Sequence, residues 1–199
     1  MIPKEYNFYY WGPLLFKIKI TPQDLKKCAE LCSKESSDVR DTLAGVIEHQ
    51  HYISPMAYCK ILEPYLEAFR HGHKQWYGKP LTQAMVMTTS WVNFMVAGEF
   101  NPPHIHTKCN FSSVLFVKIS EELKEEHKKF INDHATYLGE GPGAITFNYG
   151  ETQPHSLYTK NFFPEEGDLF IFPATLTHFV APFASKGERI SMSANFELT

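Results

Sequence analysis

The spacing of hydrophobic residues along the chain changes near Leu81. Before that point the spacing is mostly that of amphipathic helices, and after it apolar and polar residues alternate with the period of half-buried strands. The elements predicted for the first part are a strand at Phe8–Ile20 and helices at Thr21–Ser33, at Asp38–His49 and from Ser54 onward. A capping residue followed by proline, at Thr21-Pro22 and at Ser54-Pro55, is typical of a helix start. Pro64 predicts a kink or a break in the third helix.

The second part of the chain predicts β structure. Its predicted strands are Ala84–Val96, Val114–Ile119, Ala144–Tyr149, His155–Tyr158, Leu169–Phe172, His178–Ala181 and Arg189–Leu198. One helix is expected among them, from Ser120 to about His134, because its acidic start and its later lysines suit the helix dipole. Such a set of strands, separated by Gly and Pro, favours a sandwich or a closed barrel. We therefore predict a mainly β fold with supporting helices: one domain over residues 1–199, with helical support at about 21–77 and a β core at about 81–199.

Composition and charge narrow the class of protein. The chain has 199 residues, of which 43% are hydrophobic and 21% charged, which excludes a disordered or collagen-like chain. A net charge of −3 gives no general attraction to phosphate backbones or anionic lipids, so nucleic acid is not indicated as a partner. No apolar stretch is long enough for a membrane span, and the N-terminal residues lack the pattern of a signal peptide. The four cysteines form no CxxC pair, so we expect reduced thiols and a cytoplasmic location.

Histidine occurs ten times, and three pairs have the spacing HxH. These are His49-Gln50-His51, His71-Gly72-His73 and His104-Ile105-His106. In a strand, residues i and i+2 point to the same face, whereas in a helix they point away from each other and cannot chelate one ion. The first two pairs end or follow helical patterns, so we expect them at helix ends or on the surface. The third pair leads into the strand-rich stretch and is the candidate metal-binding pair.

A catalytic metal site generally needs three protein ligands and open positions opposite them. The candidate third ligand is His178, which lies in an apolar stretch directly after the buried strand Leu169–Phe172. His155, which follows Pro154, is the alternative.

The last predicted strand has one polar face. Arg189, Ser191, Ser193 and Asn195 alternate there with apolar residues. A buried arginine is costly unless it meets an anion, and its planar fork suits a carboxylate. That carboxylate could belong to a ligand or to an acidic residue of the protein, and the pattern alone leaves both open.

A set of short motifs resembles the iron(II)- and 2-oxoglutarate-dependent oxygenases, and among them the small oxygenases of bacteria and their phages. The matching segments, in family order, are Ser90–Asn93, Gly98–Asn101, His104–His106, Ser112–Val117, Pro164–Pro173, Leu176–His178 and Glu188–Ser191. The resemblance implies a double-stranded β-helix (jelly roll) that binds Fe(II) and 2-oxoglutarate. It also implies that His178 is the distal iron ligand and that Arg189 with Ser191 binds the far carboxylate of 2-oxoglutarate. Asn93 and Asn195 are expected either to be polar neighbours of this co-substrate or to satisfy backbone groups.

The sequence departs from the wider superfamily at His106, where the usual ligand is a carboxylate. One interpretation has His104, His106 and His178 as an all-histidine iron triad. In the other, His106 points away or binds substrate, and Glu99 or a water takes its place. The segment Glu121–His134 is a second departure, which could form a lid or only enlarge the surface.

The function implied by the resemblance is hydroxylation of a substrate with release of succinate and carbon dioxide. The substrate, a small molecule or a protein side chain, is not indicated by the sequence, and neither is the oligomeric state. Two alternatives remain: a cupin-like metal dioxygenase or isomerase that does not use 2-oxoglutarate, and a non-catalytic jelly-roll binding module.

Overall fold

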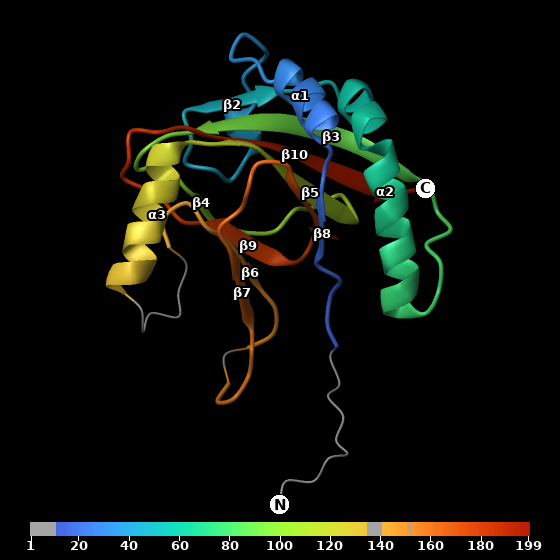
Figure 1. The fold of residues 1–199 in the computed structure, drawn as a ribbon. Coiled ribbons are helices and arrows are strands. Elements are labelled where there is room, and N and C mark those ends of the chain that lie inside the picture. The colour runs from blue at the N-terminus through green and yellow to red at the C-terminus, as the bar shows by residue number, and fades with distance from the viewer. Residues whose placement is uncertain (1–10, 135–140, 152) are drawn as a thin grey trace, which may run out of the picture.

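Two antiparallel sheets form the framework of the chain in the computed structural model, which describes residues 11–134, 141–151 and 153–199 (Figure 1). The larger sheet has the strand order β1-β8-β5-β10-β3-β2, and the smaller has the order β4-β9-β6-β7. The strands are β1 (Phe16–Lys19), β2 (His49–Tyr52), β3 (Met85–Met95), β4 (Asn101–His104), β5 (Phe111–Ile119), β6 (Ile145–Asn148), β7 (Thr159–Phe162), β8 (Asp168–Pro173), β9 (Thr177–Val180) and β10 (Arg189–Leu198). The helices are α1 (Pro22–Leu31), α2 (Pro55–Tyr77) and α3 (Glu121–Asp133), with a short 3₁₀ helix at Arg40–Thr42.

The two faces of the larger sheet bury different side chains. Met192, Ala194 and Phe196 of β10 belong to a core shared with α1 and α2, which cover the outer face of the larger sheet in Figure 1. The opposite face packs against the smaller sheet through a second core with many phenylalanines. The odd-numbered residues of β10 point to this inner side because strand residues alternate between faces. The polar face predicted for the last strand therefore lies between the sheets.

The predicted helix at Asp38–His49 is wrong. Only Arg40–Thr42 is helical, and the segment ends in strand β2, which pairs with β3. Asp38 forms a bridge with His51, and a side chain at Gly45 would lie 2.5 Å from Oδ1 of Asn101. Long-range pairing and this close approach of Gly45 outweigh the local helical pattern.

The predicted break in the third helix and one predicted strand are wrong. Helix α2 continues through Pro64 as a single helix, because Pro64 lies on its exposed face, where solvent can satisfy the carbonyl that proline leaves free. The predicted strand at His155–Tyr158 is wrong: His155 lies in a turn with φ of 61°, and β7 begins at Thr159. Part of the strand predicted at Phe8–Ile20 lies outside the described residues, and its described strand is β1. None of the helices in the described ranges is long and apolar enough to cross a membrane.

Candidate metal centre

His104 and His178 lie opposite each other in the smaller sheet. His104 ends β4, His178 lies in β9, and the two are direct partners in the antiparallel pairing of these strands. β4 is an edge strand that contains Pro102 and Pro103. An edge strand tolerates proline because one side of it makes no ladder hydrogen bonds. The sequence pattern missed β4 because Asn-Pro-Pro is typical of a turn.

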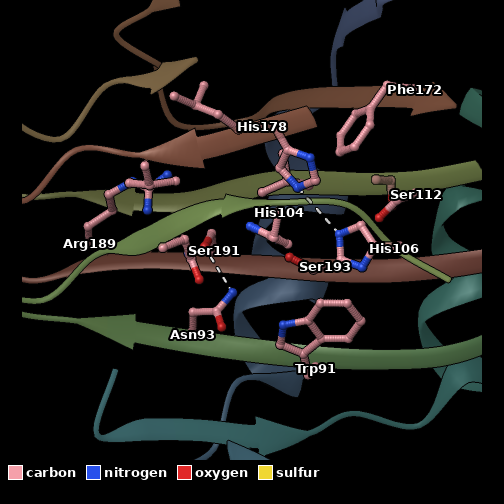
Figure 2. A pocket seen from close by; sticks show the side chains of 15 residues that line it. Trp91, Asn93, His104, His106, Ser112, Phe172, His178, Arg189, Ser191 and Ser193 are labelled. Atoms are coloured by element: carbon pink, nitrogen blue, oxygen red, sulfur yellow. Dashed lines mark hydrogen bonds between the residues drawn. The ribbon is translucent and has the colours of Figure 1, made fainter. Parts of the chain in front are cut away.

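His106 completes a cluster of three imidazoles. It follows β4, and its backbone N–H donates to the carbonyl of Ala174 at 2.8 Å. Its Nε2 lies 3.3 Å from Nε2 of His178 (Figure 2). One ligand atom from each of His104, His106 and His178 lies within 4.8 Å of the others. This is the one group of potential metal ligands with such spacing among the described His, Cys, Asp and Glu residues.

Backbone contacts and burial prepare these imidazoles for a metal. Nδ1 of His104 is 2.7 Å from the carbonyl of Pro102, and Nδ1 of His178 is 2.9 Å from that of Leu176. A carbonyl accepts, so each Nδ1 carries the proton and leaves Nε2 with its lone pair. Burial, with the neighbouring charge of His104, lowers the pKa of His106 to about 4 and that of His178 to about 3. The imidazoles are therefore neutral at pH 7, the form that binds a metal.

Arg189 is a buried cation in the same pocket. Only 1% of its surface is exposed, and its Nη1 donates to Sδ of Met95 at 3.4 Å while its guanidinium lies 4.6 Å from the centre of the Phe116 ring. Its Nε and Nη2 are buried without a hydrogen-bond partner. Burial lowers its pKa to about 9. None of the described residues that line the pocket is an aspartate or glutamate that could pair with Arg189.

A row of polar side chains crosses three strands beside Arg189. Ser191 of β10 pairs with Asn93 of β3, and Asn93 pairs with Gln50 of β2. Nδ2 of Asn93 donates to Oγ of Ser191 at 3.4 Å, and Nε2 of Gln50 donates to Oδ1 of Asn93 at 2.7 Å. This row holds Ser191 and Asn93 in fixed positions at the wall of the pocket (Figure 2).

One pocket of about 420 Å³, counted with its open mouth, connects the cation and the imidazoles. Arg189, Ser191 and Asn93 line it together with the three histidines. The remaining lining is mainly serine and apolar side chains. The structure thus brings together six of the seven residues predicted for the site.

Asn195, the seventh, lies elsewhere. It lines a neighbouring pocket that also contains Gln50, Trp91, His104 and His106, and it does not line the pocket of Arg189. Sequence analysis missed Gln50. The mistaken helix at Asp38–His49 hid it, because β2 is a short strand, His49–Tyr52, without alternating burial.

The other candidate ligands lie apart from the cluster. The Glu99 carboxylate accepts hydrogen bonds from the backbone N–H groups of Glu48 and Val96 and closes a loop. His49 and His51 share a strand rather than a helix end, and Nδ1 of His51 contacts the carbonyl of Ser36. His71 and His73 lie within α2, near its C-terminal end, rather than after it.

Comparison with known proteins decides the family. Residues 89–195 match the model of a family described as "Putative 2OG-Fe(II) oxygenase". The chain belongs to this family. The predicted enzyme class, a 2-oxoglutarate-dependent oxygenase, is thereby confirmed. A search of curated protein sequences found no match.

Solved structures agree on the fold of this 2OG-Fe(II) oxygenase. A prolyl-4-hydroxylase from Pseudomonas putida matches with a TM-score of 0.58 and 17% identity, over 92% of this chain and 91% of that one. HygX from Streptomyces hygroscopicus, with nickel, 2-oxoglutarate and hygromycin B bound, matches with a TM-score of 0.54 and 9% identity, over 93% and 83%. A prolyl hydroxylase from Trichoplax adhaerens in complex with a hypoxia inducible factor peptide fragment matches with a TM-score of 0.53 and 10% identity, over 88% and 75%. These similarities confirm the double-stranded β-helix.

Proposed function

We propose that this oxygenase hydroxylates its substrate with Fe(II) held by His104, His106 and His178 and with 2-oxoglutarate held by Arg189 and Ser191. The observation that carries the proposal is Arg189, a buried cation with two unpaired donors in the pocket that contains the histidine cluster. A buried guanidinium without a protein carboxylate beside it is costly, so its retention is explained by an anionic ligand.

The donor set suits the proposed metal and its co-substrate. Neutral imidazole binds divalent iron, and three of them leave coordination positions open for other ligands. Without a carboxylate ligand, the site keeps the full charge of the ion, which favours a dianionic keto acid. The proposal therefore uses the all-histidine triad, while Glu99 keeps its role in closing a loop.

The chain's own residues bind and orient the co-substrate. Arg189 offers Nε and Nη2 to one carboxylate, and Oγ of Ser191, held by Asn93, stands beside it. Bound iron and 2-oxoglutarate supply the oxidising chemistry: the substrate C–H, dioxygen and 2-oxoglutarate become the hydroxylated product, succinate and carbon dioxide. The apolar walls around His178, including Phe172 at 4.7 Å between ring centres, exclude water from the reaction.

The test is an anaerobic titration with Fe(II) and 2-oxoglutarate, followed by the visible charge-transfer band. We expect a band for the wild type that is absent in His178→Ala and in Arg189→Ala, and succinate formation on admission of oxygen. Metal binding without a band and without succinate supports the cupin-like alternative. No metal-dependent change in any signal supports the binding module.

The substrate is not settled by the solved neighbours, one of which is bound to a peptide fragment and another to hygromycin B. We keep a cytoplasmic location as part of the proposal because all four cysteines are free thiols, as in reducing compartments.

A further inference from the structure

A second pocket adjoins the pocket of Arg189 at His104 and His106. It shares Trp91, Asn101 and the two histidines with the first pocket. Its outer wall is the loop at residues 42–45, and its empty volume is about 620 Å³. A molecule in this pocket therefore contacts the candidate metal ligands without occupying the space beside Arg189.

The lining of this second pocket is polar but uncharged. Apart from the two histidines, which are candidate metal ligands, its described lining holds no acidic or basic side chain. Three carboxamides line it, from Gln50, Asn101 and Asn195. The chemistry of the wall favours an uncharged partner, because no charged side chain in the described lining offers a counter-charge.

Two of the three carboxamides have an unused hydrogen-bonding atom. Oε1 of Gln50 and Oδ1 of Asn195 are buried and lack a hydrogen-bond partner. Gln50 is 1% exposed, and its amide is fixed from the other side by the contact of Nε2 with Asn93. A buried amide without a partner at the edge of a pocket indicates a ligand that supplies the missing hydrogen bond.

We propose that the second pocket binds the substrate through an uncharged carboxamide or peptide group, with Gln50 and Asn195 as specificity-determining residues. This inference rests on the proposed function for its place in the reaction. A carboxamide N–H can donate to the two unpaired side-chain oxygens, and the group carries no charge. A site built to hydrogen-bond such a group discriminates strongly against analogues that lack it.

The two specificity residues are separated along the larger sheet. Gln50 pairs with Asn93 and Asn195 pairs with Thr89, four positions apart on β3. At a rise of about 3.3 Å per residue, the two contact points are about 13 Å apart along the strand. Trp91 lies between them on the same strand, so a substrate held at both points extends past His106, whose ring centre is 5.8 Å from that of Trp91.

The test uses four probes of equal length: butyramide, butyrate, butylammonium and 1-butanol. They are titrated into ¹⁵N-labelled protein loaded with Zn(II) and saturated with 2-oxoglutarate, so that Arg189 is occupied. Butyramide is too short to reach both contact points at once, so we expect it to bind at each point separately and to shift the side-chain amide resonances of both Gln50 and Asn195. Its affinity should exceed that of the other three probes by about fivefold or more, the equivalent of one net hydrogen bond.

Variants separate recognition from folding. Gln50→Leu should lose about fivefold in butyramide affinity at its own contact point and keep the shift at Asn195, and Asn195→Leu should do the reverse. Gln83→Leu, at an exposed glutamine, should bind butyramide like the wild type at both points. Binding of 2-oxoglutarate by each variant checks that the protein is folded. Equal binding of a charged probe, unchanged affinity in both leucine variants, or shifts confined to other surfaces overturns the inference.

Failure of the proposed function gives a different result. If the protein fails to bind 2-oxoglutarate, the proposed function is wrong, and the same titration on the metal-free protein still tests the second pocket. If 2-oxoglutarate binds and butyramide does not, only the inference on the substrate group is wrong.

Discussion

Arg189 combines two opposing effects in one side chain. Its guanidinium is buried against Met95 and Phe116 and has two donors without partners, which destabilises the empty protein. The same unpaired donors make the pocket selective for an anion. Arg189 therefore lowers the stability of the ligand-free protein and at the same time provides a binding site for an anion.

The first prediction follows from these two opposing effects of Arg189. Arg189→Met removes the buried charge and keeps much of the side-chain volume, so it should raise the free energy of unfolding of the ligand-free protein by about 1–4 kcal/mol. It should also abolish the thermal stabilisation by 2-oxoglutarate. Urea denaturation without ligand and thermal melts with metal and 2-oxoglutarate measure the two effects. A ligand-free variant that is less stable than the wild type contradicts the prediction.

A second prediction concerns Asp24 and the pH dependence of stability. Its carboxylate accepts hydrogen bonds from Lys27, Tyr65 and Thr21, which lower its pKa to about 2 from the ordinary 3.8. A lowered pKa means that the group stabilises the fold above pH 4 and that this contribution is lost as the pH falls toward 2.

Asp24→Asn should therefore reduce the free energy of unfolding at pH 6, and the difference from the wild type should shrink between pH 4 and pH 2. Denaturation curves at several pH values measure it. Asp133→Asn, at an exposed aspartate, is the control. A difference that is constant over this pH range would falsify the role given to Asp24.

At the scale of elements, α3 anchors the connection between β9 and β10. The carboxylate of Glu126 accepts hydrogen bonds from the backbone N–H groups of Ala184, at 2.9 and 3.1 Å, and of Ser185, at 2.7 Å. This connection joins the strand of His178 to the strand of Arg189. The segment that departs from the wider superfamily thus supports the loop between two predicted site residues.

A third prediction tests this anchor. Glu126→Ala should lower the free energy of unfolding by about 1.5–3 kcal/mol, as expected for the loss of hydrogen bonds to a charged group. It should also speed amide exchange at Ala184 and Ser185. Glu125→Ala, at an exposed neighbour on the same helix, should change neither. Hydrogen exchange followed by mass spectrometry or NMR distinguishes the two variants. Unchanged exchange at Ala184 and Ser185 in Glu126→Ala contradicts the anchor.

Elements with a strong local pattern were predictable from the sequence, and those made by long-range pairing were not. α1, α2 and α3 have capping residues whose side chains accept the expected backbone hydrogen bonds. In β10, polar and apolar residues alternate strictly along the sequence. β2 and β4 exist because they pair with β3 and β9, and no local pattern records that pairing. The candidate site shows the same difference. The spacing of residues indicated the histidines and Arg189 as candidates, whereas Gln50 was missed because β2 was not predicted as a strand.

At the scale of the whole molecule, the proposed ligands connect the two sheets. His104 and His178 belong to the smaller sheet, whereas Arg189 and Ser191 belong to β10, in the middle of the larger one. In the proposed function, a metal held by the histidines alone would contact the side of the smaller sheet. A co-substrate that also reached Arg189 would span the space between the sheets.

The last prediction is therefore a two-step gain in protection from hydrogen exchange. Zn(II) alone should slow exchange in β4 and β9, and 2-oxoglutarate added to the Zn(II) form should extend the protection to β10, because ligand binding stabilises the segments that it contacts and joins. Long exchange times are needed, since β10 is already paired with β5 and β3. In Arg189→Met the first step should remain and the second should disappear. Protection of β10 by Zn(II) alone, or a second step that persists in the variant, means that 2-oxoglutarate does not bridge the sheets through Arg189.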